Sequence, residues 1–206
     1  MRNRHGLGFM AGGLLLLAAA LCLSIYNIWD DNRAAIAAET NVKRLNTAMT
    51  ETVRGELPVG MLPDYVLAPE MEMPTITIDG LEYIGRLDIP VLELSLPVLS
   101  QWSYPNMKVA PCRYSGSLYQ NNMVIAAHNY KRHFGSLKTL EVGDTVRFTD
   151  VEGNEFRYTV AELEQLAPNE VEAMITGDWD LTLFTCTAGA QYRVTVRCVL
   201  EEESLS

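Results

Sequence analysis

The sequence predicts an all-β domain, a closed barrel or a sandwich, that follows one N-terminal membrane-spanning helix. Three observations support this fold class. From about Thr75 onward, short stretches such as "TITIDGLEYIGRLDIP" alternate apolar and polar residues. Turn signals separate these stretches about every ten residues. Between Gly6 and Trp29 the chain has no charged residue. A chain of 206 residues has room for a membrane segment and one domain with its own core.

The first element is the uncharged run "GLGFMAGGLLLLAAALCLSIYNIW", residues 6–29. At about 1.5 Å per residue this run is long enough to cross a hydrocarbon core of roughly 30 Å. Two arginines precede the run and two aspartates follow it, which predicts a cytoplasmic tail at residues 1–5 and an exported remainder. Small residues in "AAIAAET" leave a cleaved signal peptide as the alternative. The length of the apolar run favours an uncleaved anchor.

Residues 30–79 are expected to connect this anchor to the β domain. Residues 31–56 have no proline, and no glycine before Gly55, which favours a helix. The apolar positions of this helix form only a thin stripe: Ile36, Val42, Leu45 and Met49. A thin stripe is typical of a stalk rather than of a core helix. Residues 57–74 contain four prolines, so we interpret them as an extended linker, free or lying across the next domain.

Residues 80–206 are predicted to form the β domain. The stretches with strand patterns are, in order, "VLELSLPVLS", "NMVIAAHN", "DTVRFTD", "NEFRYTVAELEQL", "LTLFTC" and "YRVTVRCVL". The turn "VEGN" between the third and fourth stretches predicts a hairpin. The stretch "APNEVEAMIT" is expected to contain one short helical turn. These elements are enough for one compact domain.

Charge and cysteine content exclude some functions. The formal net charge of −10 argues against nucleic-acid binding, which needs a basic surface. Four cysteines are present, and Cys22 lies in the predicted membrane span. The other three are Cys112, Cys186 and Cys198, so at least one of them must lack a partner within the chain.

Cys186 and Arg193 stand at the facing ends of two predicted strands. Cys186 ends "LTLFTC", and the small residues "TAGA" follow it. If the two strands pair as a ribbon, the short turn returns the chain beside Cys186 at Arg193. A guanidinium near a thiol favours the thiolate, and near a reacting carbonyl it stabilises an oxyanion. Cys198 shares a strand face with Val194 and Val196, which is typical of a small buried hydrophobe.

A base for such chemistry must be a histidine. The chain has three: His5, His128 and His133. His5 is expected to be cytoplasmic, and His133 lies in the polar loop "NYKRHFG", where a solvated histidine is the ordinary case. His128 follows the buried-strand pattern "NMVIAA". A base at one strand end and a nucleophile at another is the arrangement that covalent acyl transfer requires.

These residues resemble the sortase family, the membrane-anchored cysteine transpeptidases of Gram-positive bacteria. "TLFTC", residues 182–186, is similar to the family's Thr-Leu-x-Thr-Cys strand end, and Arg193 opens the next strand as the family's arginine does. "MVIAAHN" supplies the histidine, and "FGSLKTLEVGD" is similar to the segment that follows it. The resemblance covers about residues 80–200.

The resemblance implies an eight-stranded barrel with short helices and an enzyme on the outer side of the cell membrane. Cys186 would attack a Leu-Pro-x-Thr-Gly-like sorting signal, His128 would protonate and later deprotonate the amines, and Arg193 would stabilise the oxyanion. Thr185 would help to position the substrate. The partners implied are surface proteins with a sorting signal and an amine acceptor, either a cell-wall precursor or a pilin lysine. The resemblance implies no required cofactor, and no acidic cluster in the sequence supports a calcium site.

The sequence departs from the family pattern in two places. Only seven positions separate Cys186 from Arg193, which makes Arg197, on the same strand face, the alternative for the arginine. Residues 62–74, "LPDYVLAPEMEMP", are interpreted as a linker, with a lid over the site as the alternative.

Two other classes of function remain open from the residues alone. A papain-like thiol protease is the first, although such enzymes place Cys before His along the chain and here His128 comes first. A non-catalytic domain is the second, with Cys186, Cys112 and His128 in a disulfide or a zinc site. No C-x-x-C or H-x-x-H pair is present to support zinc.

Overall fold

The computed structural model describes residues 3–53, 62–187 and 189–201 of the chain. It divides into two compact units, residues 1–33 and 34–206. The first unit consists of the N-terminal part of helix α1 (Asn3–Val53). Apolar side chains between Phe9 and Trp29 are mostly exposed. By length and composition α1 contains a stretch that is long and apolar enough to cross a membrane.

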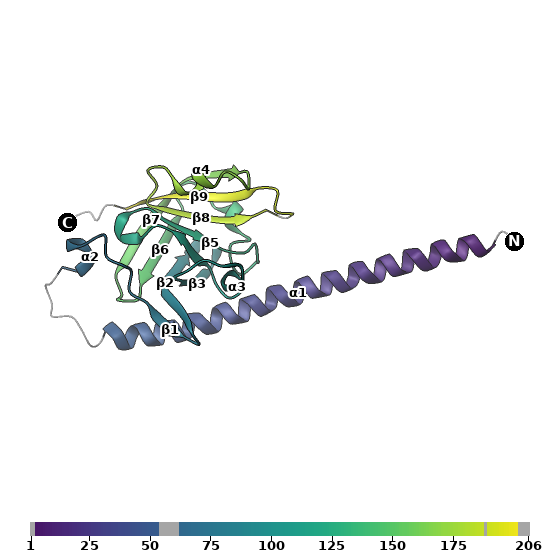
Figure 1. Ribbon diagram of the computed structural model, residues 1–206, viewed down its shortest axis with the longest axis horizontal. Coiled ribbons are helices and arrows are strands. Elements are labelled where there is room, and N and C mark those ends of the chain that lie inside the picture. The colour runs from purple at the N-terminus through teal and green to yellow at the C-terminus, as the bar shows by residue number, and fades with distance from the viewer. Residues whose placement is uncertain (1–2, 54–61, 188, 202–206) are drawn as a thin grey trace. The chain divides into compact units, whose positions relative to one another are not determined.

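The second unit is built around one closed sheet (Figure 1). Its further helices are α2 (Asp64–Leu67), η1 (Pro90–Leu92), α3 (Tyr104–Met107), η2 (Leu118–Gln120), η3 (Leu137–Thr139) and α4 (Val171–Ile175). Its strands are β1 (Ile76–Ile78), β2 (Leu81–Ile89), β3 (Leu94–Leu99), β4 (Cys112–Ser115), β5 (Met123–Ala126), β6 (Thr145–Asp150), β7 (Glu155–Leu166), β8 (Leu181–Cys186) and β9 (Arg193–Leu200).

Eight strands close the barrel in the order β2-β3-β4-β5-β8-β9-β7-β6, and β6 pairs back onto β2. Strand β1 pairs with the start of β2 beside the barrel. The predicted eight-stranded barrel with short helices is therefore confirmed. The hairpin at "VEGN" is confirmed as β6 and β7, and the helical turn as α4.

Closure of the barrel depends on a bulge in β2. The register of β2 against β3 shifts between Tyr83 and Gly85. Gly85 then pairs with Asp150 of β6. Its φ is +155°, and a Cβ there would lie 2.2 Å from the carbonyl oxygen of Thr149. Only glycine permits this close approach of two backbones.

The C-terminal part of α1 packs within the second unit, which differs from the expectation of a stalk. The buried residues of this part are Ala34, Ala38, Val42, Leu45 and Met49. Their spacing of three and four residues places them on one helix face. Ile36, which the sequence assigned to the stripe, is 67% exposed. Two alanines extend the buried face, and they are too small to stand out in an apolar pattern.

The predicted linker lies across the barrel surface where it is described; residues 57–61 lie outside the described residues. Tyr65 of α2 stacks on Tyr119 with ring centroids 4.6 Å apart and contacts Phe156 at 5.3 Å. Met73 is 5% exposed and belongs to the barrel core. Tyr119 precedes β5, so this contact lies at the end of the barrel opposite the C-terminal end of β5. The described part of the segment therefore packs on the barrel at the end where Tyr119 lies, and Tyr65 does not cover the C-terminal end of β5.

We predict that Gly85→Ala destabilises the domain by at least about 2 kcal/mol, because the new methyl group would overlap the Thr149 carbonyl. Urea unfolding followed by circular dichroism would measure the change. Gly80→Ala is the matched control, since Gly80 also has a positive φ but a Cβ added there would meet no other atom within 4 Å. Equal losses for the two variants would contradict the role of close approach.

Candidate active site

Two parallel strands bring His128 and Cys186 to one edge of the barrel. β5 pairs with β8 from Met123↔Leu181 to Ala126↔Phe184. The pairing continues through Ala127, whose amide donates to the Phe184 carbonyl at 3.2 Å. His128 and Cys186 each stand two residues beyond the last pair. Because parallel strands end at the same edge, the two residues are neighbours in the fold.

Arg193 joins them from the antiparallel side. β8 and β9 pair in a register that sets Cys186 directly opposite Arg193. Residues opposite one another in an antiparallel pair point to the same face of the sheet. The predicted arrangement of a thiol and a guanidinium at facing strand ends is thus present in the structure.

The three residues share the outer face of the barrel. Leu181 and Leu183 of β8 belong to the barrel core, whereas Phe184 belongs to a second apolar cluster on the outside. Alternation along β8 therefore turns Cys186 outward with Phe184. The same alternation in β5 assigns His128 to the face of Ala126. All three residues are partly exposed, as residues that meet a substrate must be.

Cys186 differs from the other thiols of this unit in its accessibility. Cys112 and Cys198 are both fully buried. Burial raises the pKa of each of these thiols to about 12, so neither supplies a thiolate at neutral pH. All four cysteines of the chain are free. Cys186, half-buried at a strand end, is the thiol of this unit that a reagent or substrate can reach.

The two arginines of β9 have different environments. Arg197 is 2% exposed. Its guanidinium donates to the Glu164 carboxylate at 2.7 Å, to the Thr182 hydroxyl at 3.0 Å and to two α4 carbonyls, Ala173 at 2.6 Å and Met174 at 2.8 Å. The Nη1 atom of Arg193 is buried and has no hydrogen-bond partner among the described residues. Arg197 is therefore already engaged within the protein, and Arg193 has donors left for a ligand.

Thr185 faces the barrel interior rather than the outer face. Its side chain is 3% exposed and its hydroxyl donates to the Ala127 carbonyl at 2.9 Å. This bond ties the end of β8 to the residue before His128. The Thr185 hydroxyl therefore contacts the segment that carries His128. A role of Thr185 in positioning the substrate stays a prediction.

The sequence did not indicate the ring contacts that extend from His128. The Tyr130 ring lies 5.2 Å from the His128 ring and 5.4 Å from the His133 ring. His133 is fully buried, so the expectation of a solvated histidine is wrong. A polar sequence context gave no signal for burial; the adjacent Phe134, also fully buried, is the only local hint.

A chain of aromatic rings extends from the floor of the site toward solvent. Phe184 is met edge-on by Tyr114 at 5.3 Å, and Tyr114 by Trp102 at 5.4 Å. Trp102 then contacts Tyr104 at 5.3 Å. Trp102 is 38% and Tyr104 67% exposed. The outer face next to Cys186 is thus bordered by α3 and its preceding loop.

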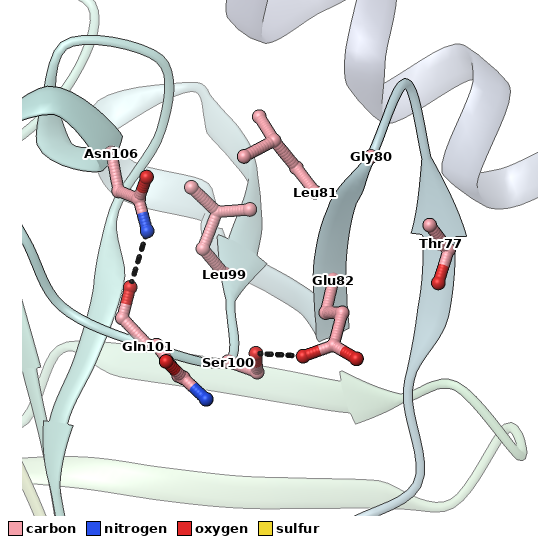
Figure 2. A pocket seen from close by; sticks show the side chains of 8 residues that line it. All are labelled: Thr77, Gly80, Leu81, Glu82, Leu99, Ser100, Gln101 and Asn106. Carbon is pink, nitrogen blue, oxygen red and sulfur yellow. Dashed lines mark hydrogen bonds between the residues drawn. The ribbon is translucent and has the colours of Figure 1, made fainter.

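A hollow of about 260 Å³ lies elsewhere, along β1, β2 and the loop before α3 (Figure 2). In it the Ser100 hydroxyl faces the Glu82 carboxylate at 3.4 Å, and the Asn106 amide donates to the Gln101 carbonyl. None of the residues that line it is a candidate catalytic residue. Among the described residues, no group of three or more His, Cys, Asp or Glu side chains is arranged to hold a metal ion.

We predict that iodoacetamide alkylates Cys186 at least about 100-fold faster than Cys112 or Cys198 at pH 8. A thiol with a pKa of about 12 is ionised to about one part in ten thousand at that pH. Peptide mapping of the Cys22→Ser chain over time would measure the three rates. Alkylation of the buried thiols should speed up about tenfold per pH unit until unfolding; comparable rates at pH 8 would contradict the assignment.

We predict that the two arginines of β9 contribute very differently to stability. Arg197→Ala should lower the free energy of unfolding by about 3–5 kcal/mol, because it leaves Glu164 and two carbonyls without their buried cation. Arg193→Ala should cost less than about 1 kcal/mol, since Arg193 is partly exposed. Urea unfolding of both variants checks this, and a larger loss for Arg193→Ala would reverse the two roles.

Comparison with known proteins agrees with this geometry. A family model described as the sortase domain matches residues 87–201. Sortase A of Bacillus anthracis is 28% identical over 123 residues, which cover 57% of this chain and 58% of that protein, so the match spans less than two thirds of the relative's length.

Two similar solved structures share the fold. A Clostridium perfringens sortase D5 transpeptidase has a TM-score of 0.55 at 20% identity, covering 68% of this chain and 88% of that one. Clostridium perfringens sortase C with the C-terminal cell wall sorting motif has a TM-score of 0.52 at 20% identity, covering 78% and 87%. Because the family model matches more than half of the chain, the chain belongs to the sortase family, whose members are cysteine transpeptidases.

Proposed function

We propose that the chain is a cysteine transpeptidase that cleaves a Leu-Pro-x-Thr-Gly-like sorting signal and transfers the protein to an amine. The observation that carries the proposal is the outward-facing edge formed by Cys186, His128 and Arg193. The sorting motif bound by the similar sortase C supports the substrate class. The acceptor is an amine of a cell-wall precursor or a pilin lysine.

The first half of the reaction forms a thioester. The Cys186 thiolate attacks the carbonyl carbon of the Thr–Gly-type bond, and the guanidinium of Arg193 donates hydrogen bonds to the oxyanion that develops. The C–N bond then breaks as His128 gives a proton to the leaving amine. The N-terminal product stays bound to sulfur as an acyl-enzyme.

The second half reverses these roles. The acceptor amine attacks the thioester carbonyl, His128 takes the proton that the amine loses, and the C–S bond breaks to regenerate the thiolate. Arg193 again stabilises the oxyanion. Thr185 supports both halves indirectly, because its bond to the Ala127 carbonyl holds the segment that ends at His128.

The apolar run of the first unit supports a proposal for the location of the chain. We propose that residues 6–29 anchor the chain as a single-pass membrane helix, with residues 1–5 cytoplasmic and residues 80–206 as an extracellular catalytic domain. Arg2 and Arg4 before the apolar run, and Asp30 and Asp31 after it, support this orientation. Residues 30–79 join anchor to barrel, partly packed along it as described above.

The test is mass spectrometry of the full chain in detergent micelles with sorting-signal peptides. We expect a thioacyl adduct on Cys186 that Cys186→Ala abolishes. His128→Ala and Arg193→Ala should each lower turnover at least about 100-fold while the unfolding midpoint stays close to that of the parent chain. The proposal would be refuted if no peptide adduct forms although iodoacetamide alkylates Cys186 in the same sample.

Product analysis separates transfer from hydrolysis, the second candidate activity. With an added amine nucleophile such as triglycine, we expect the amide product to exceed the hydrolysed peptide, because amine and water compete for one acyl-enzyme. If only hydrolysed peptide forms with and without the amine, the chain is a thiol hydrolase.

A further inference from the structure

The segment after β5, residues 127–136, holds three rings in contact. The Tyr130 ring contacts two imidazoles, and its centroid lies 5.2 Å from that of His128 at an interplanar angle of 51°. It also meets the His133 ring nearly edge-on, at 5.4 Å and 73°. Both distances fall in the range of favourable aromatic pairs. His128 is therefore in contact with a ring that is itself in contact with His133.

The His133 ring is buried although the two residues before it are exposed. Lys131 and Arg132 are exposed, whereas His133 is 0% exposed and Tyr130 is half-buried. A fully buried side chain has few positions open to it. The edge-on contact of His133 with Tyr130 therefore limits where the Tyr130 ring can lie.

The backbone fixes the same three residues. The Tyr130 carbonyl accepts from the amides of His133 at 3.0 Å and Gly135 at 2.9 Å. The Phe134 amide donates to the His128 carbonyl at 3.3 Å. Phe134 is fully buried in the barrel core. A Cβ at Gly135 would lie 2.7 Å from the Tyr130 carbonyl oxygen, so the loop is closed as tightly as glycine permits.

We propose that Tyr130, backed by His133, is a positioning residue that sets the plane of the His128 imidazole. The inference rests on the proposed function, in which one imidazole must give a proton to one amine and take a proton from another. Both transfers require the ring to hold one orientation, and small misplacement of a catalytic group lowers the rate steeply. The contact that carries the inference is the one between the two rings, 5.2 Å apart.

Kinetics of the full chain in detergent micelles give the first test. Tyr130→Leu and His133→Leu remove a ring but keep apolar bulk, and each should lower kcat about 10- to 100-fold with KM changed less than about twofold. Tyr130→Phe and His133→Phe keep a ring, and each should retain kcat within about threefold. A loss of activity in Tyr130→Phe equal to that in Tyr130→Leu would overturn the role of the ring.

A spectroscopic test does not depend on turnover. The chain has three histidines, so the Hε1 resonance of His128 can be assigned by its loss in His128→Gln. Because the Tyr130 ring current acts on its neighbour, this resonance should move in Tyr130→Leu and stay near its original position in Tyr130→Phe. Tyr65→Leu, which removes a stacked tyrosine at the opposite end of the barrel, should leave it unmoved.

The two tests separate this inference from the proposed function. If the parent chain transfers no acyl group but the resonance moves only in the ring-removing variant, the ring contact stands and the proposed function fails. If the resonance does not move in Tyr130→Leu, or moves while kcat is unchanged in a working enzyme, Tyr130 does not position His128.

Discussion

The parallel pairing of β5 with β8 is the constraint on which the candidate site depends. Its register, Ala126 beside Phe184, places the residues that follow each strand at one edge and on one face. A slip of one residue in β8 would turn Cys186 toward the barrel core, and a slip in β5 would do the same to His128, because side chains alternate. The core leucines of β8, Leu181 and Leu183, oppose such a slip, since it would expose them. Burial of apolar residues thus orients the thiol.

The buried guanidinium of Arg197 supports the outer face of the barrel that carries Cys186. Arg197 connects β7, β8 and α4 through Glu164, Thr182 and two helix carbonyls. Burying a charge is costly unless every donor is satisfied, and here four acceptors surround one guanidinium. Arg193 and Arg197 lie on one strand face, so alternation alone does not distinguish them. Their burial and hydrogen-bond partners distinguish them. Arg193 has donors free for a ligand, whereas the donors of Arg197 bind β7, β8 and α4.

Local patterns predicted the strands, and non-local contacts decided what the sequence left open. Alternation identified β8 and β9 and placed Cys186 opposite Arg193. Alternation did not indicate that β2 pairs with β6 to close the barrel. The bulged residue Gly85 pairs with Asp150, which is distant in the sequence. The packing of α1 was missed since alanine gives little hydrophobic signal. His133 was misassigned for a related reason: its burial depends on Tyr130 and on the closed loop, neither of which a polar stretch reveals.

The short connection between β8 and β9 explains how a spacing of seven residues still serves the site. The Thr187 amide donates to the Tyr192 carbonyl at 2.9 Å, and the Thr187 hydroxyl accepts from the Tyr192 amide at 3.1 Å. Gly189 and Ala190 adopt positive φ, +82° and +56°, which allows the chain to reverse in few residues. The ladder therefore continues one pair beyond Cys186↔Arg193, and a longer turn is unnecessary. Because Thr187 closes the turn immediately after the sulfur-bearing residue, the guanidinium opposite Cys186 is Arg193, and Arg197 stays four residues farther along the strand.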